Sequence, residues 1–167
     1  AARPYAEALE GVLSGLAAAF PALELTGSEV AAEGLGLAAG RAPRAQLIQM
    51  DARRIPFREE FDVAGAFDVI EHIEDDGAVL RALRDALVPG GGLLLTVPQH
   101  PFLWSEYDAR ARHVRRYRAG ELRGKALEAG FEIVKMTSFV TLVLPLMIVS
   151  RLMQRSPGAD YDPLSEL

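Results

Sequence analysis

The residues best suited to chemistry lie in one short stretch, where an apolar run turns acidic at Asp68. The adjacent pair Glu71 and His72 follows, and a segment with the apolar spacing of a helix begins at about Asp76. Ligands of parallel α/β sheets bind outside the carboxyl ends of the strands. An apolar strand, a polar crest at residues 68–72 and a helix start therefore predict a ligand-binding edge.

Two earlier segments with strand character also end in acidic residues. Residues 23–29 end at Glu29, and residues 45–51 end at Asp51. Polar residues at strand ends often only meet solvent, and for each acid alone this explanation is as good as ligand binding. Three such acids in order, with Asp68 as the third, favour a crevice that accepts hydrogen bonds from ribose hydroxyls or an amino group of a nucleoside.

The remaining elements place these strands in an alternating α/β pattern. Strands that alternate with helices at this spacing form a mainly parallel, doubly wound (Rossmann-like) sheet with helices on both faces, a three-layer sandwich. We expect one domain over residues 1–167 with its core at about 11–136. Helices are expected at 11–20, 30–41, 76–88 and 120–129, and further strands at 93–98 and 131–136.

Composition excludes several classes of function. The chain has 167 residues, a net charge of −5 and no cysteine, which argues against general nucleic-acid binding and excludes disulfides, thiolate metal sites and a cysteine nucleophile. We find no signal peptide, and the longest apolar run, 139–149, is too short to span a bilayer. A cytoplasmic protein is expected.

The motifs in this order resemble class I S-adenosylmethionine-dependent methyltransferases, over about residues 11–136. Each motif alone is weak, and their order and spacing together are specific. The matching segments are 25–29, 50–52 with 55–57, 61–62 with 67–73, and 87–93.

The resemblance implies S-adenosylmethionine as the cofactor and gives roles to the crest and strand-end residues. Glu29 would hold the ribose hydroxyls, and Asp51 with the backbone of Ala52 would address the adenine amino group. Asp68 and its neighbours would lie near the methionine half and the sulfonium. The implied cofactor-binding residues are Glu29, Val30, Asp51, Ala52, Asp68, Val69 and His72.

One departure from the family concerns residues 7–12. The family begins with a strand and a Gly-x-Gly loop directly before the helix expected at Gly11, and this segment supplies neither. Either the fold is degenerate and cannot bind the cofactor, or the sequence omits residues near Glu10 and Gly11. We favour omission, because losing the most buried strand should unfold the domain. Omission predicts a jump in the backbone between Glu10 and Gly11.

The loop at residues 99–118 is expected on the acceptor side. Arginines would recognise an anionic or polar acceptor between aromatic walls, or they would pair with local acids such as Glu106 and Asp108 in a solvated loop. Both explanations stay open, and one basic cluster on an acidic chain does not favour nucleic acid. The candidate acceptor-binding residues are Trp104, Tyr107, Arg115, Arg116 and Tyr117.

Catalysis of methyl transfer rests mainly on alignment, because the sulfonium is already activated. A base is needed only if the acceptor loses a proton, and the candidates are His72, then His113, then His100. For His72 a role in orienting the crest beside the cofactor is preferred. No metal site is expected, because Glu71 and His72 are adjacent and should diverge.

The leading function is methyl transfer to a small-molecule acceptor. A catalytically silent, methyltransferase-like binding subunit and a nucleotide-binding oxidoreductase are the rivals. Residues 137–167 form an apolar segment and a tail. For residues 139–153 a core or interface helix is preferred over membrane contact, and the protein would be a monomer or a homodimer.

Overall fold

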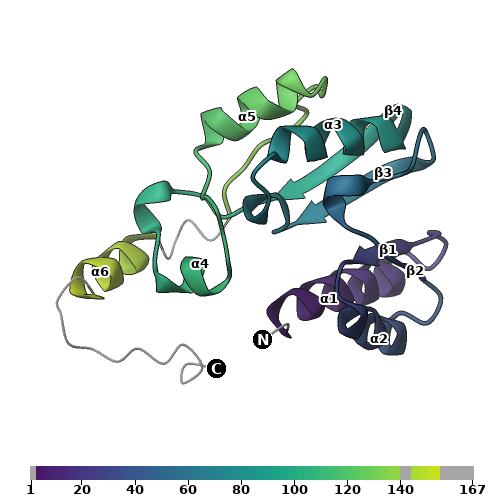
Figure 1. The fold of residues 1–167 in the computed structure, drawn as a ribbon, viewed down its shortest axis with the longest axis horizontal. Coiled ribbons are helices and arrows are strands. Elements are labelled where there is room, and N and C mark those ends of the chain that lie inside the picture. Colours follow the sequence, from purple (N-terminus) through teal and green to yellow (C-terminus); the bar gives the residue numbers. More distant parts are fainter. Residues whose placement is uncertain (1–2, 140–143, 155–167) are drawn as a thin grey trace.

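The computed structural model describes residues 3–139 and 144–154 of the chain (Figure 1). Its first half alternates helices with short strands. Helix α1 is followed by β1, α2 and β2, and the two strands pair in parallel from Thr26↔Gln46 to Glu29↔Gln49. The bounds are α1 Arg3–Ala19, β1 Thr26–Glu29, α2 Ala32–Arg41 and β2 Gln46–Gln49.

The second half repeats the alternation with longer strands. Strands β3 and β4 pair in parallel and keep a regular register from Val63↔Gly92 to Phe67↔Thr96. Helix α3 lies along this pair in Figure 1. The bounds are β3 Phe61–Phe67, α3 Asp76–Ala86, β4 Leu87–Thr96, α4 Glu106–Arg110, α5 Ala119–Glu128 and α6 Leu144–Gln154, with short 3₁₀ turns η1 Ala52–Arg54, η2 Ile70–His72 and η3 Pro101–Leu103.

The sequence accounts for α3 in detail. Asp75 caps its first turn, because its side chain accepts a hydrogen bond of 2.9 Å from the Ala78 amide. Val79 and Leu80 are buried in a cluster with Ile70, Tyr117 and Ala129, so the apolar face of the helix packs on the core. The helix ends two residues earlier than predicted, because β4 begins at Leu87 and includes the glycines expected to form a turn.

The parallel α/β class is confirmed, and the sheets are small. Among the described residues the strands form two separate two-stranded sheets, β1–β2 and β3–β4. Each half has its own apolar core: Leu13, Ala38 and Ala42 form the cluster of the first half, and the cluster around Leu80 belongs to the second.

Two sequence predictions are wrong, one at Glu10 and Gly11 and the other at residues 131–136. Helix α1 runs unbroken through Glu10 and Gly11, so the backbone has no jump there. The strand predicted at 131–136 is not formed, and Val134 is 98% exposed. A strand is stable only beside a hydrogen-bonding neighbour, and none of the described strands pairs with this segment.

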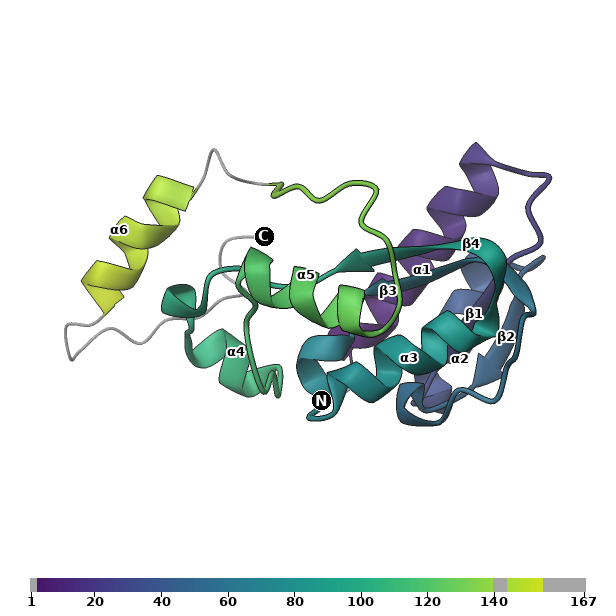
Figure 2. The ribbon, with the colours of Figure 1, turned by 90° about the horizontal axis from the view of Figure 1, so that it is seen from above.

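The predicted apolar segment begins as a helix at Leu144, and residues 140–143 lie outside the described part. Helix α6 contacts η3 and stands apart from both sheets in Figure 2. Leu146 is 71% exposed, so within the described chain α6 is not a core helix. None of the described helices has the length and apolar character needed to cross a membrane.

A close contact between β1 and α1 gives a test of the first core. Gly27 is buried, and a Cβ added there would lie 2.5 Å from Cδ1 of Leu13. Gly27→Ala is therefore expected to destabilise the protein by about 1–3 kcal/mol, as overpacking does. Urea unfolding measures the change. Gly36→Ala is the matched control: its Cβ would meet open space in α2, so it should be neutral or stabilising by up to about 1 kcal/mol. Equal stability of the two variants would contradict the packing argument.

Candidate functional site at the crest

The crest begins where β3 ends. Asp68 has a φ of 53°, in the left-handed region that few residues other than glycine adopt. Its amide donates to the Thr96 carbonyl at 3.1 Å, and the Thr96 hydroxyl donates to its carboxylate at 3.3 Å. Such backbone outliers cluster at functional sites, so the geometry of Asp68 supports the crest as the site.

The 3₁₀ turn η2 then directs two neighbouring side chains to one place. Glu71 is fully buried, and its Oε1 lies 3.9 Å from Nε2 of the adjacent His72. The prediction that these side chains diverge is wrong, because the tight turn brings both to the same side. The prediction that the chain has no metal site rested on this divergence, so that argument no longer holds.

Residues 99–118 fold back onto the crest. The amide of His100 donates to the Tyr117 carbonyl at 3.0 Å, and the Tyr117 amide donates to the Pro98 carbonyl at 2.9 Å. Further along the loop, the Val114 amide donates to the carbonyl of Glu71 at 2.8 Å. The loop therefore carries His113 to the crest, where its ring centroid lies 4.6 Å from that of His72.

Asp108 holds the loop from inside. It is fully buried; its Oδ2 accepts from the amide and hydroxyl of Ser105, and its Oδ1 accepts from Arg116 Nε at 2.7 Å. Nδ1 of His113 lies 3.0 Å from the same Oδ1. Burial alone would raise the pKa of Asp108, but hydrogen bonds from Arg116, His113 and Ser105 lower it below its usual value.

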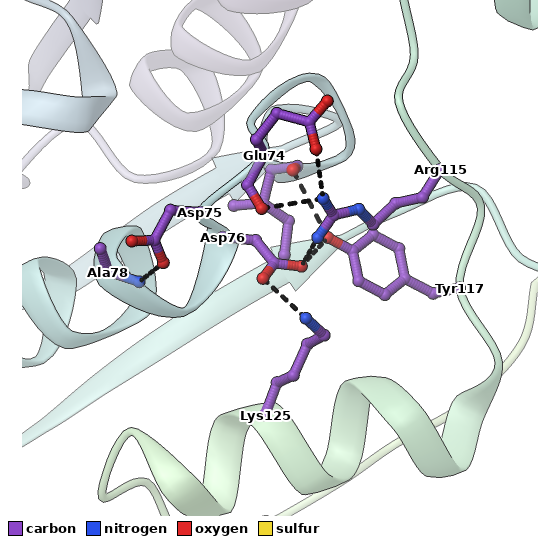
Figure 3. A network of polar contacts seen from close by, with 8 residues as sticks. Glu74, Asp75, Asp76, Ala78, Arg115, Tyr117 and Lys125 are labelled. Atoms are coloured by element: carbon purple, nitrogen blue, oxygen red, sulfur yellow. Dashed lines mark hydrogen bonds and ion pairs between the residues drawn. The ribbon is translucent and has the colours of Figure 1, made fainter.

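A second buried carboxylate, Asp76, ties the loop to α3 and α5 (Figure 3). Nη1 of Arg115 and the Tyr117 hydroxyl donate to its Oδ2, each at 2.6 Å. Nζ of Lys125 donates to its Oδ1 at 2.7 Å. The pKa of Tyr117 is raised, first by burial and then by the Asp76 carboxylate.

These contacts divide the predicted acceptor residues into two groups. Tyr117 is 1% exposed and Arg115 and Arg116 are engaged with buried acids, so their geometry favours a structural role. The explanation by pairing with local acids is confirmed for Arg116, which binds Asp108, and for Arg110, which binds Glu106 at 3.2 Å. Trp104 and Tyr107 are exposed, and the Tyr107 ring lies 6.4 Å from that of His113.

On the cofactor side, the strand-end acids lie where the sequence placed them. Oε1 of Glu29 accepts from the amides of Val30 at 2.7 Å and Ala31 at 3.1 Å. Asp51 caps η1, and its hydrogen bonds from Arg53 lower its pKa to about 2. The Met50 amide donates to the Glu29 carbonyl at 3.1 Å, so both acids stand at one edge of the β1–β2 pair.

Ala52 joins this edge to the crest. It is the first residue of η1, and it packs against the core cluster that contains Ile70 of the crest. The carboxylates of Glu29 and Asp51 can accept hydrogen bonds of the kind that the ribose hydroxyls and the adenine amino group of S-adenosylmethionine donate. Residues 7–12, where the family has its Gly-x-Gly loop, lie inside α1.

The burial of the Glu71 carboxylate is the feature of the crest that the sequence did not predict. Both of its carboxylate oxygens are buried and have no hydrogen-bond partner. Burial, followed by the nearby Asp68 charge, raises its pKa to about 8, and burial also lowers the pKa of His72. Glu71, His72 and His113 each offer a ligand atom within 4.8 Å of the others. Glu71 and His72 were expected on the crest, but their meeting with His113 was not predicted, because His113 joins them only through the fold of the loop.

A hollow of about 430 Å³ lies elsewhere, at the start of α3. It is lined by Glu74, Asp75, Asp76, Gly77, Arg81, Lys125 and Glu128. None of these residues was predicted to bind the cofactor or the acceptor. Lys125 and Asp76 of this lining pair with each other at 2.7 Å, in the network that ties α5 to α3.

Comparisons with known proteins bear on the family and the fold. A family model described as a methyltransferase domain matches residues 10–136. A search of the curated proteins found no match.

Solved structures share the fold. A candidate methyltransferase of Bacillus halodurans is 20% identical with a TM-score of 0.66, covering 78% of this chain and 62% of that one. An S-adenosylmethionine-dependent methyltransferase of Thermotoga maritima is 25% identical with a TM-score of 0.58, covering 74% and 61%. A phosphoethanolamine N-methyltransferase of Haemonchus contortus, in complex with S-adenosyl-L-methionine, is 22% identical with a TM-score of 0.66, covering 84% and 35%. The chain spans 62%, 59% and 59% of the first three solved relatives.

Proposed function

Because this chain belongs to the methyltransferase-domain family, we propose that it transfers a methyl group from S-adenosylmethionine to a small-molecule acceptor. The observation that carries the proposal is the set of three acids at the carboxyl ends of β1, β2 and β3. Glu29 is the last residue of β1, Asp51 lies two residues after the end of β2, and Asp68 directly follows β3 with a φ of 53°.

The residues of the chain would act mainly by binding and orientation. Glu29 would accept hydrogen bonds from the ribose hydroxyls, and Asp51 with Ala52 would meet the adenine ring. The cofactor, when bound, supplies an activated methyl group on its sulfonium. The protein then has to hold the acceptor in line with that methyl carbon.

The acceptor side of the proposal rests on the exposed aromatic residues. Trp104 and Tyr107 stand on the loop that folds over the crest, and Tyr107 lies beside His113. A base role stays a prediction for His72 and His113. Asp108 orients His113 through Nδ1, which is the arrangement that positions an imidazole for proton transfer.

A silent binding subunit is the second candidate. One solved structure with this fold, 24% identical and with a TM-score of 0.62, is a [4+2]-cyclase, so the fold alone does not establish methyl transfer. Residues 7–12 also lie inside α1 and form no Gly-x-Gly loop. A small-molecule acceptor, a monomer or homodimer and a cytoplasmic location remain parts of the proposal.

Calorimetric titration separates these functions. We expect the full-length protein to bind S-adenosylmethionine with one site per chain and to show no heat with a nicotinamide dinucleotide. Binding of neither would favour the silent subunit, and binding of the nicotinamide cofactor alone would favour an oxidoreductase. A screen of small-molecule acceptors with S-adenosylmethionine labelled in its methyl group then identifies the substrate.

A further inference from the structure

We propose that Glu71, His72 and His113 bind one divalent transition-metal ion, with Zn²⁺ as the expected ion. Their ligand atoms lie within 4.8 Å of one another, and they come from two segments that meet only in the folded chain. The inference does not depend on methyl transfer.

The first argument is the state of Glu71. Its side chain is fully buried, and neither oxygen has a hydrogen-bond partner. A buried carboxylate without a partner is costly, and a protonated carboxyl would still leave its hydroxyl without an acceptor. A cation between Glu71 and the two imidazoles would give the carboxylate the partner that none of the described residues provides.

The second argument is the orientation of the histidines. Nδ1 of His72 lies 3.3 Å from the Arg112 carbonyl oxygen, and Nδ1 of His113 lies 3.0 Å from the Asp108 carboxylate. Histidines that bind metal through Nε2 are commonly held in this way, with Nδ1–H donating to a carbonyl or carboxylate. Asp108 is itself fixed by Arg116, so the second layer of the site is already built.

The third argument is the donor set and its spacing. Two imidazoles and one carboxylate are the protein ligands of several zinc sites that keep a fourth position open. Ligand atoms about 2.1 Å from a tetrahedral ion lie roughly 3.5 Å apart. Oε1 of Glu71 and Nε2 of His72 are 3.9 Å apart, so a small rearrangement of side chains closes the site.

An ion here would join η2 to the loop at 99–118. The open position would lie at the crest beside the Tyr107 and His113 rings. An acceptor hydroxyl bound there would have its pKa lowered by the ion. A histidine that binds the ion cannot act as a base at the same nitrogen, so the metal and base roles of His113 are exclusive.

The test starts from full-length protein stripped with a chelator and checked for folding by circular dichroism. We expect calorimetry to show one tight Zn²⁺ site, and elemental analysis to find one ion per chain. Glu71→Gln, which keeps the side-chain volume, and His113→Ala should each weaken Zn²⁺ binding by about 100-fold or more, because loss of an outer-shell partner alone costs 10–100-fold. His100→Asn removes the remaining histidine, outside the cluster, and should bind like the wild type.

The visible absorption of bound Co²⁺ is a second readout. It reports metal ligation directly, so it would not respond if these residues had only a structural role. Co²⁺ in a site of low coordination number gives intense visible absorption, which should appear in the wild type and be lost in Glu71→Gln. A stripped, folded wild type that binds no Zn²⁺ would overturn the inference, as would a folded Glu71→Gln protein that binds Zn²⁺ like the wild type. The titration is made without S-adenosylmethionine, so a folded protein that binds the cofactor but fails to bind Zn²⁺ would remove the metal site and leave the proposed function intact.

Discussion

Replacing Asp76 with alanine is expected to lower the free energy of unfolding by about 3–5 kcal/mol, the usual cost of removing one partner from a buried ion pair. Asp76 is 2% exposed and accepts hydrogen bonds from Arg115, Tyr117 and Lys125. Alanine would leave two cations and a buried phenol without their acceptor. The loop at 99–118 and helix α5 would both lose their polar attachment to the first turn of α3.

Urea unfolding measures this loss, and the neighbouring acid provides the control. Asp75 is exposed and caps α3, so Asp75→Ala should cost only about 1 kcal/mol. If the two alanine variants were equally stable, the network in Figure 3 would not hold the loop.

The same carboxylate predicts the direction of the acid response. Burial alone would raise the pKa of Asp76, but hydrogen bonds from Lys125, Tyr117 and Arg115 lower it below its usual value. A depressed pKa in the folded state contributes stability above the unfolded pKa of about 3.9, and this contribution is lost as the pH falls through the folded value. Below about pH 4, the melting temperature of Asp76→Asn should therefore fall less steeply than that of the wild type.

Replacing Glu29 with alanine is expected to weaken S-adenosylmethionine binding by about 100-fold or more. Two hydrogen bonds from ribose hydroxyls to a carboxylate contribute about 1.5–3 kcal/mol each, and alanine removes both. The same substitution frees the amides of Val30 and Ala31, which loosens the turn after β1. Calorimetry on the full-length protein measures the affinity.

Glu33→Ala is the matched control for this prediction, because Glu33 is an exposed acid in the first turn of α2. It removes the same charge a few residues away and should leave the affinity within about twofold, since exposed charges at this distance are screened. An unchanged affinity in Glu29→Ala, with folding confirmed by circular dichroism, would remove Glu29 from the site.

The sequence predicted the features that depend on local order along the chain. Alternation of apolar and polar residues, ended by an acid, located Glu29, Asp51 and Asp68 at strand ends, because a parallel strand presents its last residue to the crevice. The helix start at Asp76 followed from an acidic cap before apolar positions at helical spacing.

Features that depend on partners distant in sequence could not be predicted. Arg115 and Lys125 reach Asp76 from 39 and 49 residues away, so composition alone could not separate them from acceptor-binding cations. A signal for Asp108 did exist: Ser105 stands three residues before it, which is the spacing of a capping box. The predicted strand at 131–136 failed because a strand depends on its neighbour as much as on its own residues.

The separation of β1–β2 from β3–β4 affects how the molecule responds to its ligand. Each pair has its own buried cluster, and among the described strands no ladder crosses between them, although Ala52 packs on the second cluster. We therefore expect the two halves to behave as separate but coupled cooperative units. Glu29 and Asp51 belong to the first unit and Asp68 to the second. A nucleoside that bridges them would spend part of its binding free energy on coupling the two units. Variants with higher affinity for the nucleoside would then also unfold more cooperatively, and variants with lower affinity would unfold less cooperatively.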